Sequence, residues 1–418
     1  MTLPQPQHPP AAPPGRGVGL RAGLLWTLGG QLTYSLAQWG MVSLLAHRGT
    51  PQDVGSYSLG LALTAPIFLL LGLQLRGVQA TDAARTYTFA DYFSLRLLTL
   101  GAALLLTLVA AAFYPQVRWV ILWLGVAKAL EGVSDVIYGL MQQQERLDWV
   151  SRSTLWRGLL GLALLAGLFL QTGSVVAGAF GIALAGLLTL LVYDLPRARR
   201  LARPPWWKPR VPAALPRLAW PLGVVMGLIA LSGTLPRLFI ERELGQSAVG
   251  IYSALVYLTV AGSVVIVALG NAVTTRLSQH FAAGEGREFV RLTGRMTLAA
   301  AGVAAALSLA VWWLGGPLLQ LLYGQQYANE TRLFLILTLS GGVSYLASCA
   351  GFAVTAARRF SEQLPLFLVV TVVLALSCWL LVGTHGLVGA ALATLIASLI
   401  QLAGSWWIVA TALKSLKP

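Results

Sequence analysis

Twelve apolar segments, each close to the length that a lipid bilayer requires, run from residue 20 to residue 413 of this 418-residue chain. A helix needs about 20 apolar residues to cross the hydrocarbon core, and lipid leaves no other partner for its backbone polar groups. The pattern therefore predicts an all-α polytopic membrane protein with about twelve transmembrane helices. The predicted spans are 20–46, 55–75, 94–114, 117–141, 154–171, 174–193, 218–240, 248–271, 296–314, 331–356, 364–383 and 387–413.

Composition excludes several other classes of protein. Only 10% of the residues are charged, against about 25% in a soluble domain. Cys349 and Cys378 both lie inside apolar runs, and the four histidines have no metal-ligand spacing. Gly-rich phosphate loops and the common hydrolase and metalloprotease motifs are missing. We expect no metal, no cofactor and no enzymatic activity.

The net charge of +15 follows from membrane topology. When the N-terminus is placed in the cytoplasm, most lysines and arginines fall on the cytoplasmic side, as the positive-inside rule requires. Both termini are therefore predicted to be cytoplasmic, and we expect the membrane to be the bacterial cytoplasmic (inner) membrane. The basic charge needs no nucleic acid to explain it.

The chain divides into two groups of six spans. Val54-Gly55-Ser56-Tyr57-Ser58 opens the second span, and Val249-Gly250-Ile251-Tyr252-Ser253 opens the corresponding span of the second group. Two parallel repeats predict two lobes around a central cleft. The expected parts are a disordered cytoplasmic tail (1–19), an N-lobe (20–193), a basic cytoplasmic linker (194–217), a C-lobe (218–413) and a short cytoplasmic tail (414–418).

The fourth span carries charges at membrane depth. Lys128, Glu131 and Asp135 fall on one face of a helix, and charges there must face protein or water because exposure to lipid is costly. They predict either a polar cleft wall or coupling-ion site, or a structural charge network completed by Arg157. A glycine stripe beside them (Gly125, Gly132 and Gly139) predicts close approach of a neighbouring helix.

Two further spans carry polar candidates. Gln31, Tyr34 and Gln38 of the first span, with Thr27 and Ser35, form a neutral stripe that suits sugar hydroxyls or bonds between helices. Arg237 of the seventh span lies beside Pro236, and it is either a contact for an anionic substrate or the partner of Glu241. Tyr57 and Tyr252 are expected to be anchors in the interfacial layer.

Three local sequences resemble one family. They are Lys128–Ser153, the stretch from Thr81 to Arg96, and Leu235–Glu241 followed by Val249–Ser253. Together they resemble Wzx-type oligosaccharide flippases of the multidrug/oligosaccharidyl-lipid/polysaccharide exporter superfamily. The resemblance implies two six-helix bundles around a V-shaped cavity, an undecaprenyl-diphosphate-linked oligosaccharide as substrate, and alternating access without ATP hydrolysis. Pro236 departs from a common family pattern, which has an acidic residue before this arginine.

The expected function is therefore translocation of a lipid-linked oligosaccharide, with membrane lipids and polysaccharide-assembly proteins as further partners. The stripes of the first and fourth spans are expected to contact sugars. Candidates for capture of the diphosphate, unless they are only topology signals, are Arg76, Arg96, Arg157 and Arg276. The alternatives are a proton- or sodium-coupled drug exporter and a membrane glycosyltransferase or polymerase.

Overall fold

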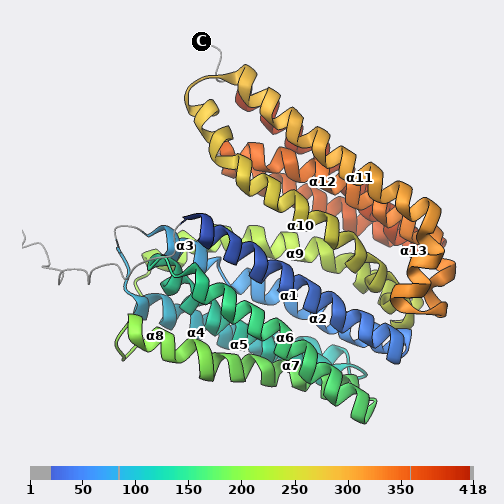
Figure 1. Cartoon of the computed structure of the whole chain (residues 1–418), viewed down its shortest axis with the longest axis horizontal. Coiled ribbons are helices and arrows are strands. Elements are labelled where there is room, and N and C mark those ends of the chain that lie inside the picture. The colour runs from blue at the N-terminus through green and yellow to red at the C-terminus, as the bar shows by residue number, and fades with distance from the viewer. Residues whose placement is uncertain (1–19, 83–84, 358, 415–418) are drawn as a thin grey trace, which may run out of the picture.

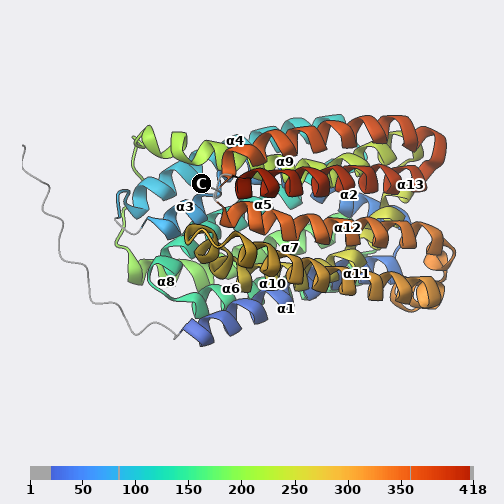
Figure 2. The same cartoon turned by 90° about the horizontal axis from the view of Figure 1, so that it is seen from above.

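A computed structural model describes residues 20–82, 85–357 and 359–414, and these residues are helical almost throughout (Figures 1 and 2). The expected tail 1–19 and residues 415–418 lie outside the described residues. The first half of the chain forms α1 (Leu20–Arg48), α2 (Pro51–Leu71), α3 (Leu75–Thr81), α4 (Phe89–Phe113), α5 (Arg118–Gln143), α6 (Leu147–Thr172), α7 (Val175–Thr189) and α8 (Leu195–Leu201). The second half forms α9 (Ala214–Leu244), α10 (Gln246–Ala282), α11 (Gly286–Tyr323), α12 (Thr331–Ala356) and α13 (Phe360–Lys414).

Within the described ranges, the helices confirm the predicted twelve spans. Nine helical stretches are long and apolar enough to cross a bilayer. One of them covers α13, which is two helices because Gly386 has φ 60° and the chain reverses there (Figure 2). The remaining two spans are α1 and α5, which are long enough but carry more polar residues.

The spans form two bundles, one from α1 to α8 and one from α9 to α13 (Figure 1). The bundles converge at the end where α1 and α9 finish, here called the far end. Toward the opposite end, which holds the loop 202–213 and is here called the linker end, α10 to α13 diverge from the first bundle, while the start of α9 stays packed on it. Side chains join the bundles at the far end: Ser43 donates to the carbonyl of Leu322 at 2.9 Å, and Gln246 donates to Ser56 at 2.9 Å. The arrangement is the predicted pair of lobes in a V.

The repeated sequence motif lies where α2 crosses α10. A Cβ atom on Gly55 would overlap the carbonyl oxygen of Gln246, and a Cβ atom on Gly250 would overlap that of Pro51. Only glycine permits this approach of the two backbones. The internal repeat therefore marks the contact between the bundles.

The tyrosines of the repeated motif are core residues, so the expectation of interfacial anchors is wrong. Tyr57 is 1% exposed and Tyr252 is 2% exposed. The hydroxyl of Tyr57 contacts the sulfur of Met41, and that of Tyr252 bonds to Thr394. The two helix starts cover each other where α2 crosses α10. This contact cannot be predicted from the sequence of a single span.

Two helices extend well past their predicted spans at the linker end. α10 has 37 residues and α11 has 38, so each is about 55 Å long against a hydrocarbon core of about 30 Å. A span predicted from apolar residues ends where the lipid ends, whereas the helix itself continues into water. The extensions carry basic residues: Arg276, Arg287, Arg291 and Arg295.

The segment expected to be the linker is helical at both ends. α8 continues from the sixth span to Leu201, and α9 begins at Ala214. Between them, Trp206 packs on the rings of Phe89 and Phe93, with centroids 5.5 and 5.6 Å away.

Candidate functional site

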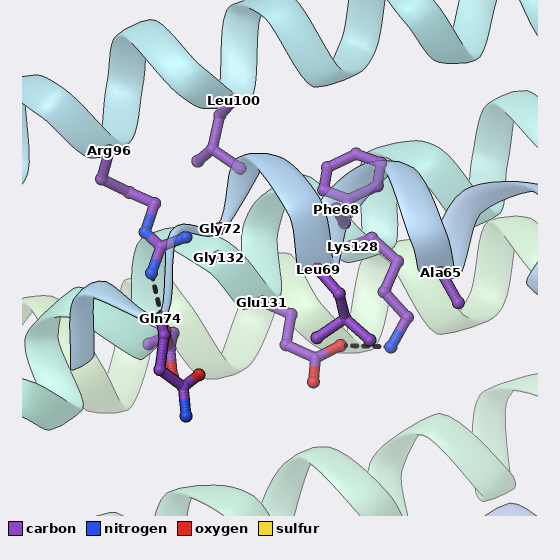
Figure 3. Close-up of a pocket in the computed structure, with 11 residues that line it drawn as sticks. Ala65, Phe68, Leu69, Gly72, Gln74, Arg96, Leu100, Lys128, Glu131 and Gly132 are labelled. Atoms are coloured by element: carbon purple, nitrogen blue, oxygen red, sulfur yellow. Dashed lines mark hydrogen bonds and ion pairs between the residues drawn. The ribbon is translucent and has the colours of Figure 1, made fainter. Parts of the chain in front are cut away.

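Helices α2, α4 and α5 of the first bundle enclose a pocket of about 220 Å³ toward the linker end (Figure 3). Its wall is partly apolar, with Phe68 and Leu100 among the lining side chains. Four of its polar groups lie within membrane-spanning helices, Arg96 on α4 and Lys128, Glu131 and Asp135 on α5, while Gln74 lies in the turn between α2 and α3. Figure 3 shows Arg96 reaching in from the helix that faces Lys128 and Glu131.

The helical period explains the pocket's charged side. Lys128, Glu131 and Asp135 are three and four residues apart, so they share one face of α5, as predicted. The predicted close approach also holds, because a Cβ on Gly125 would contact Thr107 and one on Gly132 would contact Leu100, both on α4. The glycines bring α4 near enough for its arginine to enter the pocket.

The charges of α5 form two ion pairs and not a self-neutralising trio. The Lys128 amine lies 2.8 Å from the Glu131 carboxylate, and these side chains are 28% and 37% exposed. Asp135 is instead paired with Arg96 of α4 at 2.8 Å, while an Arg76 nitrogen lies 3.9 Å away. Arg96 is 4% exposed, so Asp135 is the carboxylate that compensates its buried charge.

Arg157 of α6 does not complete these pairs; it has a partner of its own. A guanidinium nitrogen lies 3.6 Å from Asp194, whose side chain is 0% exposed. Ser134 and Ser153 both donate to Asp194 at 2.6 Å. Asp194 is not among the predicted site residues, because it falls at the start of the predicted linker 194–217. Arg157 signalled that an acid lies near the fifth span, but the sequence offered Glu131 and Asp135 of the fourth span as its partners.

A π-helical turn positions Asp194. Residues Leu190–Asp194 follow α7 with the wider i to i+5 bonding pattern, which shifts the register of the helix face. Asp194 thereby lies against Ser134 and Ser153 in the protein interior. Such turns are frequent at functional sites, although a buried ion pair is also a common structural element.

The structure brings the neutral stripe of α1 against the charged stripe of α5. Tyr34 and Gln38 line a small hollow of about 40 Å³ together with Lys128, Glu131 and Arg157. Gln38 donates to the hydroxyl of Tyr34 at 3.0 Å. Two predicted positions add nothing here: Gln31 is exposed outside the hollow, and the side chain of Thr27 lies outside the described residues.

The remaining candidates lie in the second bundle. Arg237 donates to the hydroxyl of Ser253 at 2.9 Å and to the carbonyl of Gly233. No ion pair joins it to Glu241 in the described part of the chain, so that alternative is wrong. Arg276 is exposed on the long end of α10. Of the four diphosphate candidates, only Arg76 and Arg96 therefore meet, beside Asp135.

No group of three or more His, Cys, Asp or Glu side chains with metal-ligand geometry occurs in residues 20–82, 85–357 and 359–414.

Comparisons with known proteins match both halves of the chain. Residues 20–279 match the family described as "Polysaccharide biosynthesis protein", and residues 221–377 match the MatE family. Capsular polysaccharide biosynthesis protein CapF of Staphylococcus aureus is 24% identical over 378 residues, covering 88% of this chain and 93% of the relative.

Two solved structures share the fold. The lipid II flippase MurJ in an inward closed conformation has a TM-score of 0.75 at 10% identity, covering 94% of this chain and 91% of that one. An inward-facing multidrug resistance MATE family transporter of the MOP superfamily has a TM-score of 0.72 at 15% identity, covering 93% and 95%. One of these neighbours is a flippase and the other a multidrug transporter.

Proposed function

Because the chain belongs to the polysaccharide biosynthesis protein family, we propose that it moves an undecaprenyl-diphosphate-linked oligosaccharide from the cytoplasmic to the outer leaflet. The observation that carries this proposal is the charged pocket of the first bundle. Arg96 and Lys128 both line a cavity between membrane-spanning helices. Cations at membrane depth are costly and mark pathways for charged substrates.

A diphosphate binds in this pocket by replacing the carboxylates that are now paired with its cations. Each cation now has a carboxylate partner, which compensates its charge in a site of low dielectric constant. Phosphate oxygens are equivalent acceptors for ammonium and guanidinium donors, so the substrate takes over these contacts. The displaced carboxylates of Glu131 and Asp135, which are 37% and 34% exposed, are then solvated by water. Arg76, which is 36% exposed beside Asp135, is placed to make the first contact.

Basic residues support the direction of transport. Arg197, Arg199 and Arg203 gather at the linker end, where the bundles diverge. The positive-inside rule assigns this end to the cytoplasm, with both termini on the same side. The V then opens toward the leaflet in which lipid-linked sugars are assembled, and the lipid tail remains in the bilayer between the bundles. Enzymes that build or polymerise the glycan are the expected protein partners.

A cation-coupled drug exporter is the second candidate, and the match of residues 221–377 to the MatE family favours it. Cation antiport needs a membrane acid that is free to exchange ions. Glu131 and Asp135 are each held by a cation at 2.8 Å, which favours the flippase. A deletion strain that became drug-sensitive with normal surface glycan would reverse this preference.

Deleting the gene in its own host tests the proposal. We expect surface glycan to disappear and lipid-linked repeat units to accumulate in the cytoplasmic leaflet. The purified protein should make or break no glycosidic bond when it is incubated with these lipids. Normal surface glycan in the deletion strain, or glycosyl transfer by the purified protein, would contradict the proposal.

A further inference from the structure

The second bundle contains a larger and chemically different cavity. Helices α9, α10, α12 and α13 enclose two hollows, of about 610 and 180 Å³. They share five lining residues, so they form one chamber: Ser232, Gly233, Ser344, Thr394 and Ser398. Among the described residues, no charged side chain lines the larger hollow, and Arg237 alone lines the smaller one.

Several polar groups of this chamber have no hydrogen-bond partner among the residues that the structure describes. Ser340 is 2% exposed and its hydroxyl is unpartnered. Ser344 and Ser398 line both hollows, and neither hydroxyl bonds to another group in residues 20–82, 85–357 and 359–414. The same holds for the side chains of Gln401 and Ser405 in the larger hollow.

Hydroxyl groups in membrane helices are normally satisfied within their own helix. Thr338, one turn before the chamber residues of α12, donates to the carbonyl of Phe334 at 2.8 Å. A buried polar group without a partner, as in Ser340, loses free energy relative to water, and the other groups border the open space of the chamber, where a ligand can supply the missing bonds. These groups offer neutral donors and acceptors around one space.

We propose that this chamber binds the uncharged sugars of the lipid-linked oligosaccharide, an inference that rests on the proposed function. Sugar hydroxyls both donate and accept, and serine and glutamine side chains do the same without a fixed charge. The rings of Phe352 and Phe367 offer apolar faces for the sugar C–H groups. The volume lies within the range of about 300–1,000 Å³ that small-ligand sites occupy.

The other parts of the substrate fit this chamber less well. An isoprenoid tail would cover the free hydroxyls of Ser344 and Ser398 and leave them unpaired. A diphosphate needs several cations, and Arg237 is already bonded to Ser253 and Gly233. The substrate is therefore divided, with the diphosphate in the charged pocket of the first bundle and the glycan in the chamber of the second.

Binding to the full-length protein in phosphatidylethanolamine–phosphatidylglycerol nanodiscs tests this inference. The two probes are undecaprenyl diphosphate and the lipid-linked oligosaccharide extracted from the deletion strain. The test variant combines Ser340→Ala, Ser344→Ala and Ser398→Ala. The matched control is Thr338→Val, which removes a buried α12 hydroxyl that bonds within its own helix.

We expect the triple variant to lose at least about tenfold in affinity for the glycan-bearing lipid, because three hydrogen bonds are removed. Its affinity for undecaprenyl diphosphate should equal that of wild type, which also shows that it is folded. The control should bind both lipids as wild type does.

Three results would overturn the inference. Wild-type binding of both lipids by the triple variant would place the glycan elsewhere, and equal loss for both lipids would assign the chamber to the carrier. Equal affinity of the wild-type protein for the two lipids would refute recognition of the glycan, but it would not refute the proposed function as a flippase. Wild-type protein that binds neither lipid, together with normal glycan in the deletion strain, would instead refute the proposed function itself.

Discussion

The two bundles share a helical plan but solve the problem of interior polarity in different ways. The interior of the first bundle is charged, with Lys128, Arg96 and Arg157 each paired to a carboxylate within 3.6 Å. That of the second is neutral apart from Arg237, and it holds hydroxyls such as those of Ser340 and Ser398, which have no partner among the described residues. A charge at membrane depth costs far more than a hydroxyl, so the first bundle gives its cations carboxylates, whereas Arg237 of the second bundle is bonded only to the neutral groups of Ser253 and Gly233. The contrast suits a substrate with one charged and one uncharged part.

The largest effect is expected where the first bundle buries charge most completely. Asp194→Ala should destabilise the protein by about 3–5 kcal/mol, because it leaves Arg157, which is 10% exposed, without its carboxylate. Thermal unfolding in detergent should show a large drop in melting temperature. The double variant Asp194→Leu with Arg157→Met should recover most of it. If Asp194→Ala melts like wild type, charge pairing does not stabilise this bundle.

Glu131→Gln separates a role in transport from a role in folding. Its partner Lys128 is 28% exposed and can be hydrated, so we expect a normal melting temperature. Export should fall by about tenfold, because no carboxylate then competes for Lys128 and the diphosphate is released more slowly, by the equivalent of one charge-assisted contact. The matched control is Glu288→Gln, which breaks an exposed i,i+3 pair with Arg291 outside the pocket. Full export by Glu131→Gln would remove this acid from the mechanism.

The two bundles have the same sequence motif where α2 crosses α10. A substitution at this crossing tests whether the bundles move apart there during transport. Gly250→Leu puts a side chain against the backbone of Pro51, so it should hold the far end open. Spin labels at positions 52 and 246, whose native glutamines bond at 3.4 Å, should then give longer distances, with reduced export. Gly294→Leu is the control, because no atom lies near its Cβ position. An unchanged distance would show that the contact is not a gate.

The smallest effect is expected for a hydrogen bond of the second bundle. Tyr252→Phe removes the bond to Thr394, 3.1 Å long, which is worth about 0.6 kcal/mol in a membrane. The melting temperature should therefore change only slightly. A loss as large as that of Asp194→Ala would contradict the contrast between a charged and a neutral interior.

Sequence patterns predicted the fold well because a bilayer imposes a length on every span. All twelve spans correspond to helices, and the hairpin at Gly386 separates two of them as expected. The spacing of Lys128, Glu131 and Asp135 also correctly predicted one polar face. Where helices continue into water, as α10 and α11 do, hydropathy could not predict their ends.

Partners across helices could not be predicted in the same way. Periodicity shows which residues share a face, but it does not show which helix packs against that face. The pairs Arg96–Asp135 and Arg157–Asp194 therefore became visible only in three dimensions. The chamber serines gave no signal either, since serine is common in membrane helices and is usually bonded to its own backbone.

Translocation by the purified protein tests the central claim most directly. Proteoliposomes would carry the lipid-linked oligosaccharide in both leaflets, and periodate, which does not cross the membrane, would oxidise only the outward-facing glycan. With the protein present, oxidation should proceed beyond the outer-leaflet share to completion, and Glu131→Gln should slow it. Oxidation that stops at the plateau of protein-free vesicles would contradict the assignment as a flippase.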